Sequence, residues 1–127
     1  MVSSTHTMTE INELGKVRIA HEVVGVIASL ALRNIEGIYS IGGSISEGIS
    51  EMFGKKKYNK GIQVKVEEDT VSISVNLDVE YGAKIPEISK ASQEAIKEAV
   101  ENMTGLLVSN VDIYIHRVRF LDEKDNK

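Results

Sequence analysis

The sequence has no cysteine, no long apolar run and no excess of basic residues. Among 127 residues, the absence of cysteine excludes a disulfide framework, a thiolate metal site and a cysteine nucleophile, and it suits a reducing cytoplasm. The longest apolar stretch, residues 23–32, is too short to cross a bilayer. Residues 1–10 lack the basic and apolar blocks of a signal peptide. We therefore expect a cytoplasmic protein without a transmembrane segment.

The charge of the chain argues against a globally basic nucleic-acid binder, because the formal net charge is −4 and the isoelectric point is near 5.4. One basic cluster stands out, and we call it the lysine segment: Lys55, Lys56, Lys57 and Lys60. A solvated, mobile loop is its most common explanation. Contact with anionic lipid and contact with nucleic acid are the two alternatives, and only Tyr58 is available there to stack on a base.

Hydrophobic periodicity predicts one α+β domain at residues 15–120, between a flexible N-terminus at 1–14 and a charged tail at 121–127. The expected order is a strand at 16–19, a helix at 20–34, a strand at 37–41, a short helix at 44–53, a hairpin of strands at 62–67 and 71–81, a helix at 85–103 and a strand at 106–120. This order predicts a two-layer sandwich, with a mostly antiparallel sheet and the two main helices on one face.

Three local patterns add detail to this expectation. The apolar arc of residues 20–34 is wider than one stripe, which predicts a helix that is buried on most sides or also contacts a partner. Residues 44–53 place Ile45, Ile49, Met52 and Phe53 on one helical face. Arg117 breaks the alternation of the last strand, which predicts either a β-bulge near His116 or a strand end that leaves the sheet.

No catalytic, cofactor-binding or metal-binding motif is present. The three histidines are far apart, and none has a second ligand at a spacing typical of metal sites. The best arrangement for acid–base chemistry is the polar face of the predicted sheet, formed by Asp78, Glu80, Asp112, Tyr114 and His116. An open antiparallel sheet needs such residues in any case, so we interpret this face as solvated.

Four stretches resemble the alkaline shock protein family of bacteria: GKVRIAHEVVGVIASLAL, IEGIYSIGG, VEYGAKIPEISKASQEAIKEAVENMTGL and VDIYIHRVRF. Their order and spacing match the family from Gly15 to Phe120. The resemblance implies a small, non-enzymatic, cytoplasmic α+β protein of mostly Gram-positive bacteria, linked to cell-envelope stress. Some members are held at the membrane periphery by a partner protein, and one branch is associated with fatty-acid synthesis and control of acetyl-CoA carboxylase. The pair His116-Arg117 departs from the family pattern.

We therefore expect a scaffold or regulator in envelope homeostasis that forms a homo-oligomer and binds a protein, either a membrane anchor protein or carboxylase subunits. The candidate partner surface consists of Ile45, Ile49, Met52, Phe53, Lys55, Lys56, Lys57, Lys60, Val118 and Phe120. A nucleic-acid-binding regulator that uses the lysine segment is the alternative function.

Overall fold

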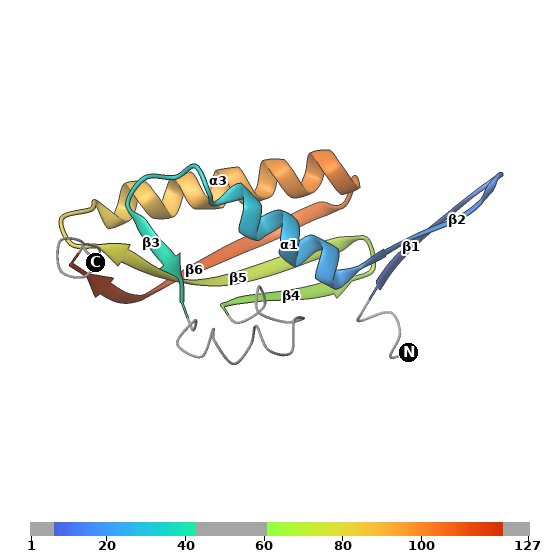
Figure 1. The fold of residues 1–127 in the computed structure, drawn as a ribbon. Coiled ribbons are helices and arrows are strands. Elements are labelled where there is room, and N and C mark those ends of the chain that lie inside the picture. The colour runs from blue at the N-terminus through green and yellow to red at the C-terminus, as the bar shows by residue number, and fades with distance from the viewer. Residues whose placement is uncertain (1–6, 43–60, 121–127) are drawn as a thin grey trace.

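The computed structural model describes residues 7–42 and 61–120 of the chain. Two helices lie on one face of a four-stranded sheet, and a separate hairpin extends from the body of the domain (Figure 1). The elements in chain order are β1 (Thr7–Asn12), β2 (Gly15–Ala20), α1 (His21–Ala31), β3 (Ile38–Ile41), β4 (Ile62–Glu67), β5 (Thr70–Glu80), α3 (Ile85–Thr104) and β6 (Leu107–Arg119). The predicted two-layer α+β sandwich is confirmed.

Strand β5 is the centre of the sheet. On one side it pairs with β6 over almost its whole length, and this pairing is parallel because α3 carries the chain back between the two strands. On its other side it pairs antiparallel with β4 and β3, which lie end to end. Asn76 marks the junction of these two strands: its N–H donates to the Gly61 carbonyl at 2.8 Å, and its carbonyl accepts from the Gly42 N–H at 2.6 Å. Gly61 has to be glycine, because any side chain would collide with the Gly42 carbonyl oxygen.

The core lies between the sheet and the two helices. The helix-facing side of β5 is at most 1% exposed at all five of its apolar positions: Val71, Ile73, Val75, Leu77 and Val79. Helix α1 buries Val24 and Ala28 against this layer, and α3 buries Ile96 and Val100. The predicted strand and helix periodicities are thus confirmed. Met103, in the last turn of α3, lies outside this core and is 71% exposed.

The predicted bulge in β6 is confirmed. Leu77 is paired with Ile115 and Asp78 with Arg117, so His116 is an extra residue in β6. Without it, strict alternation after Ile115 would turn Arg117 toward the helix layer. With it, Arg117 shares the outer face with Asp78. A second shift in register lies between residues 108 and 110.

The N-terminal hairpin was not predicted as such. Strand β1 lies within the segment expected to be flexible, because residues 1–13 show no alternation that would indicate a strand. The sequence predicted only its partner strand, which runs from Gly15 to Ala20. The turn between them is built on Asn12, whose Oδ1 accepts the N–H groups of Leu14 at 2.8 Å and Gly15 at 3.1 Å. The short helix predicted at residues 44–53 lies outside the described residues.

The end of α3 is tied to the start of β6 by one carboxylate. Glu101 accepts hydrogen bonds from Lys97 Nζ at 2.8 Å and from the Val108 N–H at 2.9 Å. These two bonds, the one from Lys97 first, lower the pKa of Glu101. Lys97 and Glu101 thus form an ion pair one helical turn apart. Gly105 then ends the helix in the left-handed conformation, with φ of 81°.

Candidate partner-binding surface

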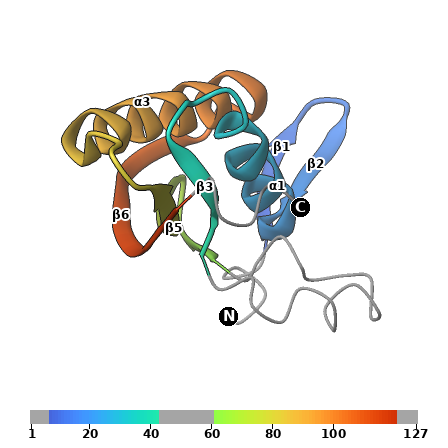
Figure 2. The ribbon, with the colours of Figure 1, turned by 60° about the vertical axis from the view of Figure 1, so that its left-hand side comes forward.

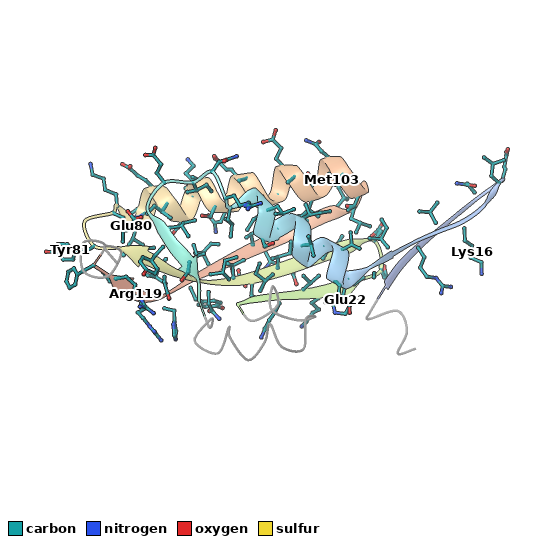
Figure 3. The ribbon with its side chains drawn as sticks, viewed as in Figure 1. Lys16, Glu22, Glu80, Tyr81, Met103 and Arg119 are labelled. Atoms are coloured by element: carbon teal, nitrogen blue, oxygen red, sulfur yellow. The ribbon has the colours of Figure 1, made fainter. Side chains whose placement is uncertain are left out.

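An apolar groove runs between α1 and α3 on the side of the helices that faces away from the sheet. It has a volume of about 670 Å³, and it is lined by Glu22, Val23, Val26, Ile27, Leu30, Ala31, Ala99 and Met103. We call it the helix groove. Three of its large side chains face solvent: Val23 is 45% exposed, Leu30 is 50% exposed and Met103 is 71% exposed. Glu22 and Met103, at the start of α1 and the end of α3, are labelled in Figure 3.

The wide apolar arc of α1 explains the groove. Val24 and Ala28 satisfy the core, so Val23, Val26 and Leu30 remain on the flank that faces α3 and solvent. Contiguous apolar surface of this kind marks interaction sites in soluble proteins. On this side α1 is not buried by the described residues, since Val23 and Leu30 remain exposed.

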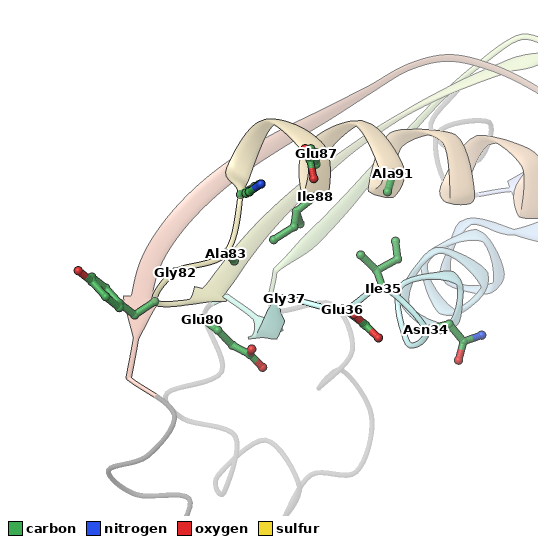
Figure 4. Close-up of a pocket in the computed structure, with 12 residues that line it drawn as sticks. Asn34, Ile35, Glu36, Gly37, Glu80, Gly82, Ala83, Glu87, Ile88 and Ala91 are labelled. Atoms are coloured by element: carbon green, nitrogen blue, oxygen red, sulfur yellow. The ribbon is translucent and has the colours of Figure 1, made fainter.

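A second hollow, of about 750 Å³, lies at the start of α3 between the loop after α1 and the loop after β5 (Figure 4). It carries the charged residues Glu36, Glu80, Lys84 and Glu87. The carboxylates are not arranged as a metal site, since no group of three His, Cys, Asp or Glu side chains in residues 7–42 and 61–120 is placed to hold an ion. Its floor is tightly packed, because a Cβ atom on Gly37 would lie 2.5 Å from Ile88 Cδ1.

The polar sheet face is real, but one of its members is not solvated as expected. Asp78 is only 2% exposed. Its Oδ2 accepts a hydrogen bond from Ser40 Oγ at 3.2 Å and lies 3.9 Å from Arg119 Nε, while its Oδ1 lies 3.6 Å from His116 Nδ1. The bulge brings the His116 and Arg119 side chains onto the outer face beside Asp78, and the Arg119 guanidinium provides a counter-charge for the buried carboxylate.

This cluster has the character of a structural ion network. Arg119 also lies over the ring of Tyr39, with its Cζ atom 5.2 Å from the ring centre. Of the other two carboxylates of the predicted face, Asp112 is paired in register with Ser74, two rows away from Asp78.

Of the ten residues predicted to form a partner surface, only Val118 and Phe120 belong to the described part of the chain. Val118 is 46% exposed and Phe120 is 50% exposed. The Phe120 ring packs on Tyr81 at a centroid distance of 4.8 Å. Ile45, Ile49, Met52, Phe53 and the four lysines of the lysine segment lie outside the described residues. Met103 lines the helix groove but was not among the residues that the sequence predicted for a partner surface.

These features define a small two-layer α+β protein with an apolar groove between its helices and, in residues 7–42 and 61–120, no group of three His, Cys, Asp or Glu side chains placed to hold a metal ion. In the same part of the chain, no helix has the length and apolar character needed to cross a membrane. The sequence model of the ASP23 family, described as having a cell envelope-related function, matches residues 9–120. The chain therefore belongs to this family, and the resemblance to alkaline shock proteins is confirmed.

Individual relatives agree with this assignment. The chain is 36% identical over 111 residues to Bacillus subtilis YqhY, covering 87% of this chain and 82% of that protein. It is 32% identical over 107 residues to YloU of the same organism, covering 83% of this chain and 89% of that one. A Streptococcus pyogenes protein named as a homolog of the stress response regulator gls24 is 24% identical over 102 residues, covering 80% of this chain and 57% of that protein.

Proposed function

We propose that this protein is a non-enzymatic scaffold or regulator in cell-envelope stress and homeostasis, and that it acts by binding a protein partner in the helix groove. Family membership supports the link to the envelope. The name of the gls24 relative supports a role in stress response. The observation that carries the proposal is the set of three large apolar side chains, Val23, Leu30 and Met103, that line one groove and face solvent.

The chemistry of the groove indicates what the partner presents. Glu22 is its one charged lining residue, so binding there depends on burying apolar area. An amphipathic helix fits such a groove, because side chains at a spacing of three and four residues form a single apolar stripe. The partner is a membrane anchor protein, which would bring this cytoplasmic protein to the membrane periphery, or a carboxylase subunit, which would link it to fatty-acid synthesis. Self-association is part of the same proposal.

The test is a pull-down from native cells with the tagged chain, the soluble and membrane fractions being kept apart. The variants Leu30→Asp and Met103→Asp place a charge in the groove. Leu14→Asp is the matched control, because Leu14 is 97% exposed at the tip of the hairpin and lies outside the groove. We expect at least about a tenfold loss of partner with the first two variants and no loss with the control, all three being folded by circular dichroism.

Each result has a defined meaning. A membrane protein in one fraction indicates an envelope scaffold, and biotin-dependent carboxylase subunits in the other indicate a regulator of lipid synthesis. If both groove variants retain the partner, the helix groove is the wrong surface, and Ile49→Asp and Phe53→Asp then test the segment at residues 44–53. Recovery of nucleic acid without protein would contradict the proposal.

A further inference from the structure

Strand β6 offers an unpaired edge. Within residues 7–42 and 61–120 it pairs only with β5, and it lies at the border of the sheet (Figure 2). The strand is 13 residues long. A long edge of this kind exposes backbone N–H and C=O groups that can pair with another chain, and natural proteins normally cover it or interrupt it.

The hydrogen bonds at the two ends of β6 show which backbone groups are free. The Leu107 N–H donates to the Asp69 carbonyl at 3.4 Å, and the Arg119 carbonyl accepts from the Tyr81 N–H at 2.8 Å, so both residues turn these groups toward β5. Each register shift inserts one residue and reverses the alternation. Between the two shifts, Val111, Ile113 and Ile115 therefore direct their backbone groups to the free edge.

One side-chain contact agrees with this deduction. Gln93 of α3 reaches over the edge of the sheet, and its Nε2 donates to the Val111 carbonyl at 2.9 Å. This bond satisfies the acceptor at Val111. The N–H and C=O groups of Ile113 and Ile115 are left, and they form the regular part of the free edge.

The residues on either side of Tyr114 have matching chemical character in both directions along the chain, and we call this pattern a palindrome. From Asp112 to His116 the chain reads D-I-Y-I-H, with an acidic residue and a basic one at equal distances from Tyr114. Tyr114 is 56% exposed on the outer face, and the His116 side chain is 45% exposed. Ile113 and Ile115 are half-buried on the helix side. A palindrome of this kind is complementary to a second copy of itself that runs in the opposite direction.

We propose that two copies of this chain pair antiparallel along β6, with the two-fold axis at Tyr114. Ile113 of one copy then faces Ile115 of the other, and the free backbone groups of both residues are satisfied. Asp112 faces His116 of the second copy on the outer side. Every residue in the contact meets a suitable partner, and the two four-stranded sheets become one.

Neighbouring registers lack this complementarity. An axis at Asp112 places two carboxylates directly opposite each other, and an axis at His116 places Ile115 against Arg117. An axis between two residues would match helix-side with outer-side positions. An axis at Ile113 places Asp112 opposite Tyr114, and one at Ile115 places Tyr114 opposite His116, so only the axis at Tyr114 pairs the acidic residue with the basic one.

This inference rests on the self-association named in the proposed function, and it is independent of the helix groove. An axis perpendicular to the sheet keeps the helices of both copies on the same face. Both helix grooves then face the same way, which would let a dimer hold two partner segments at once.

Cysteine cross-linking tests the register. Because the chain has no native cysteine, only the introduced cysteine can form a disulfide. In this dimer Tyr114 faces its own copy in a pair without hydrogen bonds, in which Cα atoms are about 4.5 Å apart, close enough for a disulfide. Asn110 lies eight residues from its counterpart, or about 27 Å along the strand. Under mild oxidation we expect Tyr114→Cys to form a disulfide dimer and Asn110→Cys to stay monomeric. The reverse result, or equal cross-linking of both, would overturn the register.

Charge complementation tests the interface in solution by sedimentation. Tyr114→Lys and Tyr114→Asp each place like charges on the axis, and each should weaken self-association by at least about tenfold. An equimolar mixture of the two variants should recover dimers, since lysine then faces aspartate. Gln63→Lys is the matched control, because Gln63 is exposed on the outer face of β4 and should leave association unchanged.

Two outcomes refute the proposal: a wild-type chain that stays monomeric at high concentration, and a mixture that associates no better than its components. The pull-down described above, repeated with Tyr114→Lys, separates the two proposals. If Tyr114→Lys still captures the partner, partner binding in the helix groove does not need the β6 dimer. If Leu30→Asp loses the partner but still forms dimers, the helix groove and the β6 edge are separate binding surfaces.

Discussion

Replacing Ser92 by alanine should make the protein more stable. Ser92 lies on the buried side of α3, is 0% exposed, and its Oγ has no hydrogen-bond partner in the structure described. A buried hydroxyl without a partner costs roughly 1–3 kcal/mol of folding free energy. Alanine also has a helix propensity about 0.5 kcal/mol better than serine. Against these gains stands the loss of one packed atom, so we expect a net rise of about 1.5 kcal/mol in the free energy of unfolding.

Urea denaturation followed by circular dichroism measures this difference, and thermal unfolding should show a midpoint roughly 5 °C higher. Ser89→Ala is the control, because Ser89 is on the same helix but only half-buried. That variant should gain the propensity contribution alone, about 0.5 kcal/mol. If Ser92→Ala instead lowers stability by 1 kcal/mol or more, the hydroxyl has a partner in the folded protein and the reasoning is wrong.

Three further predictions concern the fold. Gly37→Ala should lower the free energy of unfolding in urea by at least about 1 kcal/mol more than Gly82→Ala does. Both glycines have positive φ, but only a Cβ atom at Gly37 would collide with Ile88. Equal losses of stability would refute the close contact. Since hydrogen bonding lowers the pKa of Glu101, its stabilisation is present above the carboxyl titration range and is lost as the pH falls through it. Glu101→Gln should therefore lose less stability than the wild type between neutral pH and about pH 3, and an unchanged pH profile would contradict this. Leu77→Ala, at a fully buried position, should cost about 2–5 kcal/mol by the same denaturation assay, and a cost near zero would contradict the central place of β5.

The helices and most strands were predictable because their signals are local. Alternation of apolar and polar residues determined β4 and β5, since side chains in a strand point to opposite faces in turn. Pro86 and Gly105 bounded α3 through their backbone preferences. The bulge at His116 was also visible, because a break in alternation is itself a local signal.

The candidate site was only partly predictable. The wide apolar arc of residues 20–34 predicted a helix that is buried on most sides or also contacts a partner. The sequence did not predict that Met103 lines a groove beside α1, since helical spacing does not show where the neighbouring helix stops. Asp78 was interpreted as solvated for a similar reason. Its neighbours Ser40 and Arg119 come from two other strands, and the bulge that gathers them acts through pairing across the sheet.

Sequence alone thus determined the two main helices, the strands from β2 onward, their order, the two-layer class and the family, because each of these depends on periodicity and residue type along the chain. Only the tertiary structure decided that β6 runs parallel to β5 and stands at the border of the sheet, and that α1 and α3 enclose a groove. These features arise from contacts between residues far apart in the chain. The palindrome at Asp112–His116 can be read directly from the sequence. It can pair two copies only because folding leaves the edge of β6 without a partner strand among the described residues.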